Sequence, residues 1–372
     1  MMSCCLTHAA TYYVTKSGSD WNSCTQAKTE VTARLTINAG VRCLASGDVL
    51  IVASGVYNEA LNDVIPSGRS GYPTTIKAKT AGTVTVLPLA TPSKRAEVIK
   101  FVDDSYILIQ GLIIDGVNVS AVGIRFMGNS KYSSILSSTI RNAPLDAIFF
   151  QDLASTNNTV GACKIYSIGT TTQHQGIYVR SNNNVIEDSE FYDISGYAIQ
   201  AYSSSRSISG NIIRRNVIRD SPQYRGGILV GCDYPHIASD NKIYNNLIYR
   251  NLRGIELYNY GSGNKIWNNT LYSNGSYGIT VASHQSSTEI KNNIIYYHSA
   301  AIVNSGGSTV QASNVTTNPS FVDSSRSNFR LKTGSPAIDS GKPLTEFTND
   351  LEKLLRPFGG TWDIGAYEYR LF

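Results

Sequence analysis

Histidine, tyrosine and arginine side chains are concentrated in the middle of this 372-residue chain, between residues 174 and 236. Histidine and tyrosine can transfer protons in catalysis, and arginine can neutralise an anion through a planar pair of N–H groups. Together these groups could move a proton beside a carboxylate. The candidate catalytic residues are His174, Tyr178, Arg180, Arg225 and His236.

A second set of residues, mostly tyrosine and arginine, surrounds these candidates along the sequence. Tyrosine rings pack on sugar rings, and guanidinium groups bind carboxylates or sulfates. A linear acidic polysaccharide is the ligand that this chemistry fits best. The candidate substrate-binding residues are Arg125, Tyr197, Tyr202, Tyr234, Arg253, Glu256, Tyr258 and Tyr277.

β-Elimination at a uronic acid would use both sets. The reaction needs a cation to neutralise the sugar carboxylate, a base for the C5 proton, and an acid for the departing oxygen. Arginine supplies the first, and histidine or tyrosine can supply the other two. We therefore predict an enzyme that cleaves a uronate-containing polysaccharide by β-elimination.

These residues lie on a repeat. The phrase Asn241-Lys-Ile-Tyr-Asn-Asn-Leu-Ile248 and the shorter Gly254-Ile-Glu-Leu257 recur with small changes. Eight copies pair an apolar residue with another five positions later, from Leu108 and Ile113 to Ile290 and Ile295. A period of roughly 20 to 30 residues is typical of solenoids. The prediction is an all-β, single-domain parallel solenoid of eight coils, with three short strands in each.

Side-chain alternation places the residue after each isoleucine of the Gly-Ile phrase on the outer surface. The loops are longest between Ile165 and Ile243, and insertions in a solenoid gather on its functional face. We expect a groove on these middle coils.

Hydrolysis would need two carboxylates facing one groove. Asp146, Asp233 and Glu256 are the candidates, and we expect them to lie several coils apart, which ranks hydrolysis below elimination. The sequence contains no zinc-ligand spacing, phosphate-binding loop or Gly-x-Ser-x-Gly motif.

Small or amide residues recur at one bend of the repeat. Stacked amides can form hydrogen bonds from coil to coil, so the asparagine pairs are interpreted as a turn ladder and Cys163 as a buried structural residue. The members are Gly111, Ser138, Cys163, Ser189, Asn216, Asn246, Asn269 and Asn293.

The regions around the coils of residues 61–305 are predicted to be caps. Residues 11–60 would form the N-terminal cap, with a helix from Gln26 to Leu44 hiding the first strand edge. Residues 306–372 would form the C-terminal cap, and residues 1–10 a disordered tail or signal remnant. Cys24 and Cys43 flank the helix and could form a disulfide or remain thiols.

Composition narrows the choice of partners. The net charge is +5 and no dense run of lysine and arginine occurs, so nucleic acid is not expected as a partner. No apolar run is long enough to cross a bilayer, so no membrane partner is expected. We predict a monomer that is secreted or extracellular, with the periplasm as an alternative.

The repeats resemble right-handed parallel β-helix proteins of the pectate-lyase-like superfamily, of the polysaccharide lyase and epimerase type. The opening Tyr12-Tyr-Val14 and the closing Asp363-Ile-Gly-Ala-Tyr-Glu368 are similar to the flanks of many secreted β-helix proteins. The resemblance implies that the Gly-Ile strand carries substrate on its outer face, and it suggests alginate or pectate. This fold also hosts hydrolases, esterases and inert modules.

Two alternatives follow from the resemblance. Asp233-Tyr-Pro-His236 is similar to the Asp-Pro-His signature of β-helix alginate epimerases, with Tyr234 inserted, which leaves a C5-epimerase of polyuronides open. A surface rich in tyrosine also fits a non-catalytic carbohydrate-binding or adhesion β-helix.

One acidic segment bears on cofactors. Glu187-Asp-Ser-Glu-Phe-Tyr-Asp193 offers oxygen ligands that could bind Ca²⁺, although a solvated acidic surface explains the same residues. No other cofactor and no certain metal ligand is predicted.

Overall fold

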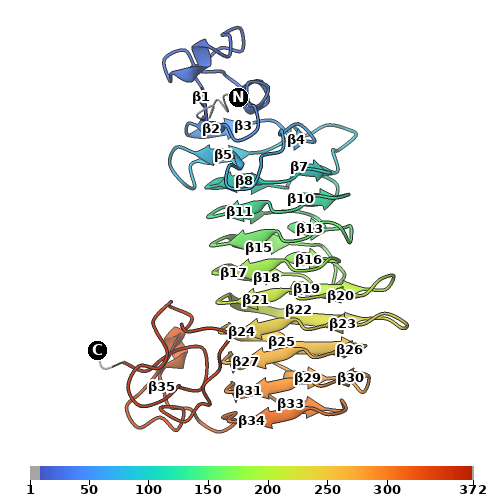
Figure 1. Cartoon of the computed structure of the whole chain (residues 1–372), viewed down its shortest axis with the longest axis vertical. Coiled ribbons are helices and arrows are strands. Elements are labelled where there is room, and N and C mark those ends of the chain that lie inside the picture. Colours follow the sequence, from blue (N-terminus) through green and yellow to red (C-terminus); the bar gives the residue numbers. More distant parts are fainter. Residues whose placement is uncertain (1–8, 371–372) are drawn as a thin grey trace, which may run out of the picture.

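Short strands coil into an elongated solenoid, and successive coils pair as parallel sheets (Figure 1). The computed structural model describes residues 9–370, without the side chains of residues 222–224. The expectation for the N-terminal tail therefore lies outside the described residues, apart from Ala9 and Ala10. No helix in the described part of the chain is long and apolar enough to span a membrane.

The first face of the solenoid is a twelve-stranded sheet. Its strands, in order, are β1 (Thr11–Val14), β2 (Val49–Val52), β5 (Thr74–Ala78), β8 (Ile107–Gln110), β11 (Ser134–Leu136), β14 (Thr159–Gly161), β17 (Val185–Glu187), β21 (Ile212–Arg214), β24 (Lys242–Tyr244), β27 (Lys265–Trp267), β31 (Glu289–Lys291) and β34 (Val310–Ala312).

The second and third faces form one eighteen-stranded sheet, because β22 (Val217–Cys232) and β25 (Leu247–Asn259) run through the corner between them. The second face also contains β3 (Gly55–Tyr57), β6 (Val84–Val86), β9 (Leu112–Asp115), β12 (Thr139–Arg141), β15 (Lys164–Ile168), β18 (Glu190–Ile194), β28 (Thr270–Tyr272) and β32 (Ile294–Tyr296). The third face adds β4 (Leu61–Asn62), β7 (Glu97–Val102), β10 (Val122–Met127), β13 (Ile148–Phe150), β16 (Ile177–Val179), β19 (Tyr197–Ser203), β29 (Tyr277–Val281) and β33 (Ala300–Asn304).

Two smaller sheets complete the strand set. A four-stranded parallel sheet continues the coils at one corner, with strands β20 (Ile208–Ser209), β23 (Ala238–Ser239), β26 (Gly261–Ser262) and β30 (Gln285–Ser286). An antiparallel pair near the C-terminus contains β35 (Phe321–Asp323), the 3₁₀ turn η2 (Ser324–Arg326) and β36 (Asn328–Leu331).

Aliphatic side chains stack in register to fill the interior. Ile186, Ile213 and Ile243 lie directly above one another on β17, β21 and β24, and none is more than 1% exposed. β-Branched residues suit this pleated, buried environment. The periodic isoleucines of the repeat are therefore the core, as the sequence predicts.

The solenoid is longer than the predicted eight coils. Leu50, Ile76 and Ile109 are in register on β2, β5 and β8, so the region predicted as a cap already belongs to the stack. At the other end, β34 pairs with β31 beyond residue 305. Irregular loop lengths conceal the period in these coils, which made the predicted limits of 61 and 305 too narrow.

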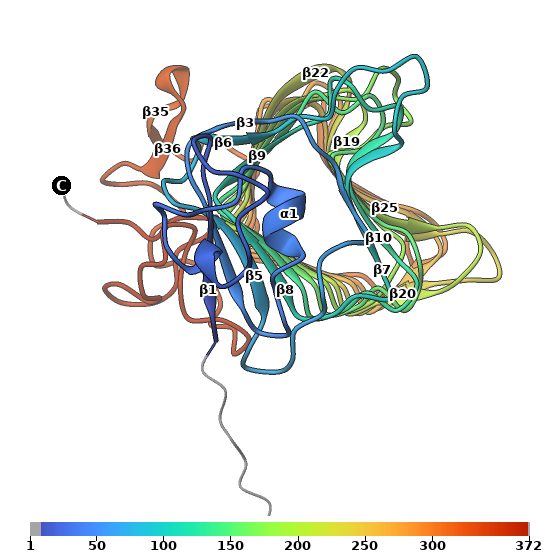
Figure 2. The same ribbon diagram turned by 90° about the horizontal axis from the view of Figure 1, so that it is seen from above.

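The predicted helix from Gln26 to Leu44 is wrong. The structure instead has a 3₁₀ turn η1 (Gln26–Lys28) and a short helix α1 (Ile37–Val41). Arg34 separates them, because its N–H donates to the Tyr13 carbonyl at 3.0 Å and its own carbonyl accepts from Thr15 at 2.9 Å. This segment is extended beside β1. Helix α1 still lies over the opening of the solenoid, as Figure 2 shows.

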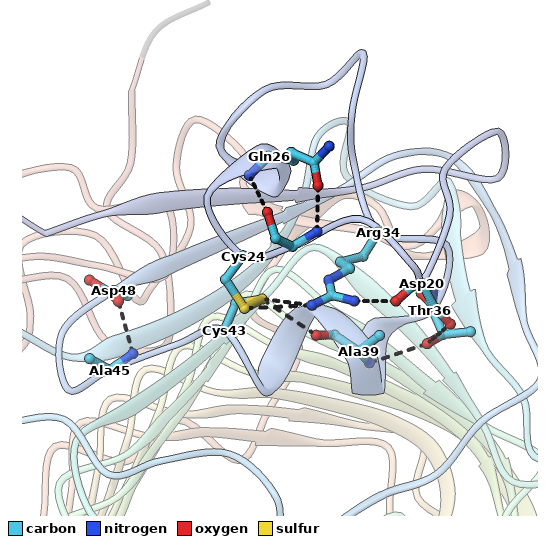
Figure 3. Close-up of a disulfide and its surroundings, with 10 residues drawn as sticks. Asp20, Cys24, Gln26, Arg34, Thr36, Ala39, Cys43, Ala45 and Asp48 are labelled. Carbon is cyan, nitrogen blue, oxygen red and sulfur yellow. Dashed lines mark hydrogen bonds between the residues drawn. A yellow bond between two sulfur atoms is a disulfide. The ribbon is translucent and has the colours of Figure 1, made fainter.

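A disulfide joins the two short helical elements of this cap. Cys24 and Cys43 are bonded, with their Cα atoms 5.3 Å apart (Figure 3). The disulfide alternative of the sequence prediction is thereby confirmed. The loop that it closes spans 19 positions, for which a disulfide typically contributes about 3 kcal/mol.

The turn ladder is confirmed for the second asparagine of each pair. Asn216 N–H donates to the Asn246 Oδ1 at 3.0 Å, and Asn246 and Asn269 repeat the bond towards the next coil. Cys163 lies in the same ladder, is 3% exposed and donates its thiol proton to the Gly161 carbonyl. Its structural role is therefore as predicted.

The C-terminal segment packs along a flank of the coils rather than over their end (Figures 1 and 2). The first asparagine of each pair holds it, because Asn245, Asn268 and Asn292 donate to carbonyls of residues 349, 363 and 342. Val303 and Val310 on the last coil stay 38% and 52% exposed. The predicted C-terminal cap of residues 306–372 is therefore corrected: β34 belongs to the last coil, and the described residues after 315 form a flank segment.

Candidate active site

One row of side chains runs along the outer surface of the third face. Parallel register aligns its members on successive coils, and the neighbouring isoleucines point inward, as alternation predicts. The row contains Arg125, Phe149, Tyr178, Gln200, Leu229, Glu256 and Thr280.

The row becomes a groove over β19, β22, β25 and β29. Two adjoining cavities, of about 360 and 410 Å³, share Arg253, Glu256 and Tyr258. These cavities bring together seven of the predicted residues, which are Tyr197, Tyr202, Arg225, Arg253, Glu256, Tyr258 and Tyr277.

Tyr197, Arg253 and Glu256 form a compact hydrogen-bonded cluster in this groove. The Tyr197 hydroxyl donates to the Glu256 Oε2 at 2.5 Å, and the Arg253 Nη1 donates to the same oxygen at 2.6 Å. The Arg253 Nη1 also lies 3.2 Å from the Tyr197 hydroxyl. Both bonds end on Oε2, so Oε1 of Glu256 has no hydrogen-bond partner within the described part of the chain.

The cluster fixes the charge states of two of its members. Burial, followed by the negative charge of Glu256, raises the pKa of Tyr197 above its usual range, so the phenol keeps its proton at neutral pH. Burial lowers the pKa of Arg253, but Tyr197 and Glu256 outweigh it and the pKa is raised. The groove thus holds a protonated phenol beside an ion pair.

Arg225 brings a further cation to the groove. Its guanidinium lies over the Tyr197 ring, 5.4 Å from the centroid. No carboxylate of the described residues is within 4.0 Å of it. Taken together, the two cavities have three charged lining residues, which are Arg225, Arg253 and Glu256. Their summed charge is +1. Such a site attracts an anionic group.

A second tyrosine–carboxylate pair borders the groove. Tyr202 donates to the Asp233 Oδ2, and the Asn259 Nδ2 donates to the Asp233 Oδ1 at 2.6 Å. Burial and then the bond to Asp233 raise the pKa of Tyr202. The rings of Tyr202 and Tyr258 lie 6.1 Å apart and form an aromatic wall.

The handedness of the solenoid comes from comparison with known proteins. A family model described as the right-handed beta helix region matches residues 153–318. This chain is a right-handed parallel β-helix. No characterised protein matches it by sequence at a significant level.

Solved structures share the β-helix over most of the chain. Pectate lyase Pel9A has a TM-score of 0.74 at 16% identity, covering 97% of this chain and 96% of its own. A rhamnogalacturonan lyase has a TM-score of 0.63 at 15% identity, covering 91% and 97%. A GH136 lacto-N-biosidase from Eubacterium ramulus has a TM-score of 0.51 at 13% identity, covering 81% and 68%. At these identities the likeness concerns the fold alone.

Four of the five predicted catalytic residues, Tyr178 among them, do not line the groove. Arg180 Nη2 donates to the Ser205 Oγ at 3.1 Å, and His236 follows Asp233 in the loop after β22. His174 lies before β16, and its Nδ1 accepts from the N–H groups of Thr170 and Thr171 at 3.1 and 3.3 Å. Partial burial lowers the pKa of His174. Its neutral ring therefore carries the proton on Nε2 and presents a donor.

Tyr178, Arg125 and Tyr234 lie on other parts of the β-helix surface. Tyr178 stacks on Phe149 with ring centroids 5.0 Å apart, one coil before Gln200. Arg125 pairs with Glu97 at 2.7 Å, five coils before Glu256 in the row. Tyr234 is 75% exposed, beyond the groove. These residues line neither groove cavity.

The carboxylates are closer than the sequence suggests. Asp233 follows β22 and Glu256 lies on β25, and these strands are direct neighbours. The expectation that these two residues are several coils apart is therefore wrong. Asp146 is separate, because it precedes β13, is buried, and accepts from the Gln175 N–H at 2.6 Å. Burial raises the pKa of Asp146 to about 7.

Two groove residues with side-chain amides, Asn259 and Gln173, were missed in the sequence. Asn259 should point inward by alternation, but its backbone has a φ of +46° and turns its side chain towards Asp233. Gln173 lines the groove from the loop before β16, and only its position beside His174 in a long loop could have indicated it.

The acidic segment around Glu187 does not fit Ca²⁺. Glu187 accepts from Arg214 and Arg215, and Asp188 pairs with Arg215 and Lys353. These carboxylates already have cationic partners. The part of the chain that the structure describes contains no group of three side chains suited to a metal ion.

Proposed function

We propose that this β-helix is a secreted, monomeric polysaccharide lyase that cleaves a uronate-containing polysaccharide, such as pectate or alginate, by β-elimination. The observation that carries the proposal is the groove in which Arg225 lies free of carboxylates beside the cluster of Tyr197, Arg253 and Glu256. The fold shared with pectate lyase Pel9A and a rhamnogalacturonan lyase supports this choice. The disulfide supports an oxidising compartment.

Four groove residues would supply the cation, the base and the acid that β-elimination requires. Arg225 and Arg253 neutralise the carboxylate of the sugar in the cleavage site, which makes its C5 proton more acidic. The unpartnered Oε1 of Glu256 accepts that proton. The C5–H electrons form the C4–C5 double bond and the C4–O bond breaks. The raised pKa of Tyr197 suits it to donate a proton to the departing oxygen.

Incubation with polygalacturonate, alginate and their oligosaccharides tests the proposal. A rise in ultraviolet absorbance from the unsaturated product, together with new reducing ends, is expected. Exchange of the C5 proton with solvent deuterium without chain cleavage would instead indicate an epimerase. Binding to a polyuronide with neither cleavage nor exchange would make the protein a binding module and exclude the lyase.

Hydrolysis is the second candidate, favoured by one observation. Asp233 and Glu256 lie on neighbouring coils, and a pair of carboxylates flanking one glycosidic bond is what most glycosidases use. The GH136 lacto-N-biosidase shows that a related fold occurs in a protein of that name. New reducing ends without ultraviolet absorbance would favour hydrolysis over elimination.

A further inference from the structure

A small polar pocket is lined by residues of the N-terminal cap. The cap lies at one end of the β-helix, and the groove strands β19, β22, β25 and β29 lie in the half of the stack away from it (Figure 1). The pocket has a volume of about 310 Å³. Its lining comes from the segment that packs around the disulfide and from the start of α1. The lining residues are Asp20, Arg34, Thr36, Asn38, Ala39 and Arg42.

Arg34 is a half-buried cation in this pocket without a carboxylate partner. Figure 3 shows its guanidinium between the disulfide and the Asp20 backbone. Nη2 lies 3.6 Å from Cys24 Sγ and 3.7 Å from Cys43 Sγ, and Nη1 donates to the Asp20 carbonyl. None of these acceptors carries a formal charge, so the guanidinium charge is not neutralised by them.

The other charges of the pocket leave a surplus of one cation. Arg42 is exposed and has no ion pair or side-chain hydrogen bond among the described residues. The Asp20 carboxylate is held by the N–H groups of Leu35 and Thr36 and by the Thr36 hydroxyl. Two arginines and one aspartate give the lining a net charge of +1, and the neighbouring Glu59 carboxylate is occupied by the N–H groups of Ile37 and Asn38 and by the Asn38 amide. The pocket therefore suits one anionic group.

Trp21 is the residue directly after Asp20, which lines this pocket. It is 97% exposed, whereas Trp267 and Trp362 are 1% and 4% exposed. The disulfide and the bonds of Asp20 fix the loop, so little chain entropy would be lost when a ligand binds. An indole ring that is exposed to water on a fixed loop is a suitable surface for the face of a sugar ring.

We propose that this cap pocket is an accessory binding site for an acidic oligosaccharide, in which Arg34 and Arg42 bind one carboxylate or sulfate group and Trp21 stacks on the sugar. The site shares a ligand class with the proposed function but needs no catalysis. Two cations without carboxylate partners in one pocket, and an exposed indole on the residue that follows the lining residue Asp20, carry the assignment. Its role would be to hold a polymer at the end of the β-helix remote from the groove.

Tryptophan fluorescence of the intact protein tests this site separately from the groove. Neither groove cavity is lined by tryptophan, and Trp21 is the single exposed one. Oligogalacturonate should shift the emission of Trp21 to shorter wavelength and protect it from acrylamide. A sulfated dextran oligosaccharide distinguishes sulfate from carboxylate as the anion, and neutral dextran oligosaccharide is the uncharged control.

Arg42→Gln is the main variant, because Arg42 is exposed and its loss should not affect folding. It should weaken binding of the acidic oligosaccharide by about tenfold, as expected for one charge-assisted contact. Arg95→Gln, which removes another exposed arginine, is the matched control and should bind normally. Trp21→Ala should abolish the signal and weaken binding measured by calorimetry.

Three results would overturn the proposal. They are unchanged Trp21 fluorescence with both acidic oligosaccharides at millimolar concentration, an equal response to neutral dextran, and equal affinity in the Arg42→Gln and Arg95→Gln variants. Loss of polyuronide cleavage in the activity assay would leave the fluorescence result unaffected, so the two hypotheses fail independently.

Discussion

Tyr197 donates its phenolic proton to Glu256 across 59 positions of sequence, at an oxygen–oxygen distance of 2.5 Å. Tyr197 lies on β19 and Glu256 on β25, with β22 between them. The bond therefore spans the groove at the point where Arg225 and Arg253 supply positive charge.

Glu256→Gln should lower kcat by about 10² to 10⁴, because the amide cannot accept the C5 proton. Initial rates on polygalacturonate or alginate measure the effect, and circular dichroism checks the fold. His174→Ala should reduce kcat much less, since His174 does not line the groove and presents a donor. A larger loss of kcat in His174→Ala than in Glu256→Gln would place the chemistry on an earlier coil.

Tyr197→Phe should lower kcat by about 10², because the departing oxygen loses its proton donor. The wild-type rate should persist at alkaline pH, where the raised pKa keeps Tyr197 protonated. A good leaving group at C4 needs no such donor, so the variant should recover most of its rate on a uronate that carries fluoride or an aryloxy group at C4. No recovery there would assign Tyr197 a purely structural role.

Arg225→Gln should reduce kcat/KM on polygalacturonate by about 10², since a cation that neutralises the substrate carboxylate is lost. On methyl-esterified pectin, which lacks that charge, the variant and the wild type should differ little. Arg95→Gln serves as the control for the change in net charge. An equal loss on both substrates would show that Arg225 does not contact the carboxylate.

Asp146→Asn should flatten the pH dependence of stability. Burial raises the pKa of Asp146 from its ordinary 3.8 to about 7, so between these values the unfolded chain has released a proton that the folded protein keeps. Rising pH over this window therefore destabilises the wild type, by at most about 1.4 kcal/mol per pH unit.

Urea denaturation at pH 4.5 and pH 7 measures this difference. The asparagine side chain can still accept a hydrogen bond from the Gln175 N–H, but it does not titrate. The free energy of unfolding of the variant should therefore fall less between pH 4.5 and pH 7 than that of the wild type. The exposed Asp193→Asn is the control. If the free energy of unfolding changed with pH equally in the Asp146→Asn variant and the wild type, Asp146 would be ionised in the folded state at pH 4.5.

Asn246→Ala should lower the free energy of unfolding by about 3 kcal/mol or more. Asn246 is fully buried, accepts from Asn216 and donates to the Ile213 carbonyl, so its removal leaves several buried polar groups unpaired. Asn129→Ala, at an exposed asparagine, should change stability by less than about 0.5 kcal/mol. Similar effects from both would show that the ladder is dispensable.

The sequence predicts the fold well where its period is regular. The isoleucines and the second asparagine of each pair repeat at fixed positions, because every coil demands the same inward residue and the same bend. Arg34 shows the opposite case. Its neighbours have helical spacing, but pairing with β1 takes precedence, and that partner is a matter of tertiary structure.

The site was predictable in part. Alternation placed Glu256 and Tyr258 outward, and loop length pointed to the middle coils, which brought most of the groove residues into the predicted set. Arg180 was predicted because alternation places it outward, and His174 because it lies in a long loop, but neither side chain lines the groove. Asn259 was not predicted, because its left-handed backbone conformation reverses the side-chain direction expected from alternation.

The C-terminal flank segment changes how the coils can come apart. A solenoid ordinarily unravels from its ends, because each coil contacts only its neighbours. Here one segment is bonded to Asn245, Asn268 and Asn292 on three successive coils, and it carries a fully buried ion pair between Arg356 and Glu368. Two of those coils carry the groove strands β25 and β29, so this end of the molecule should melt as one cooperative block, and fraying should be confined to the coils outside it.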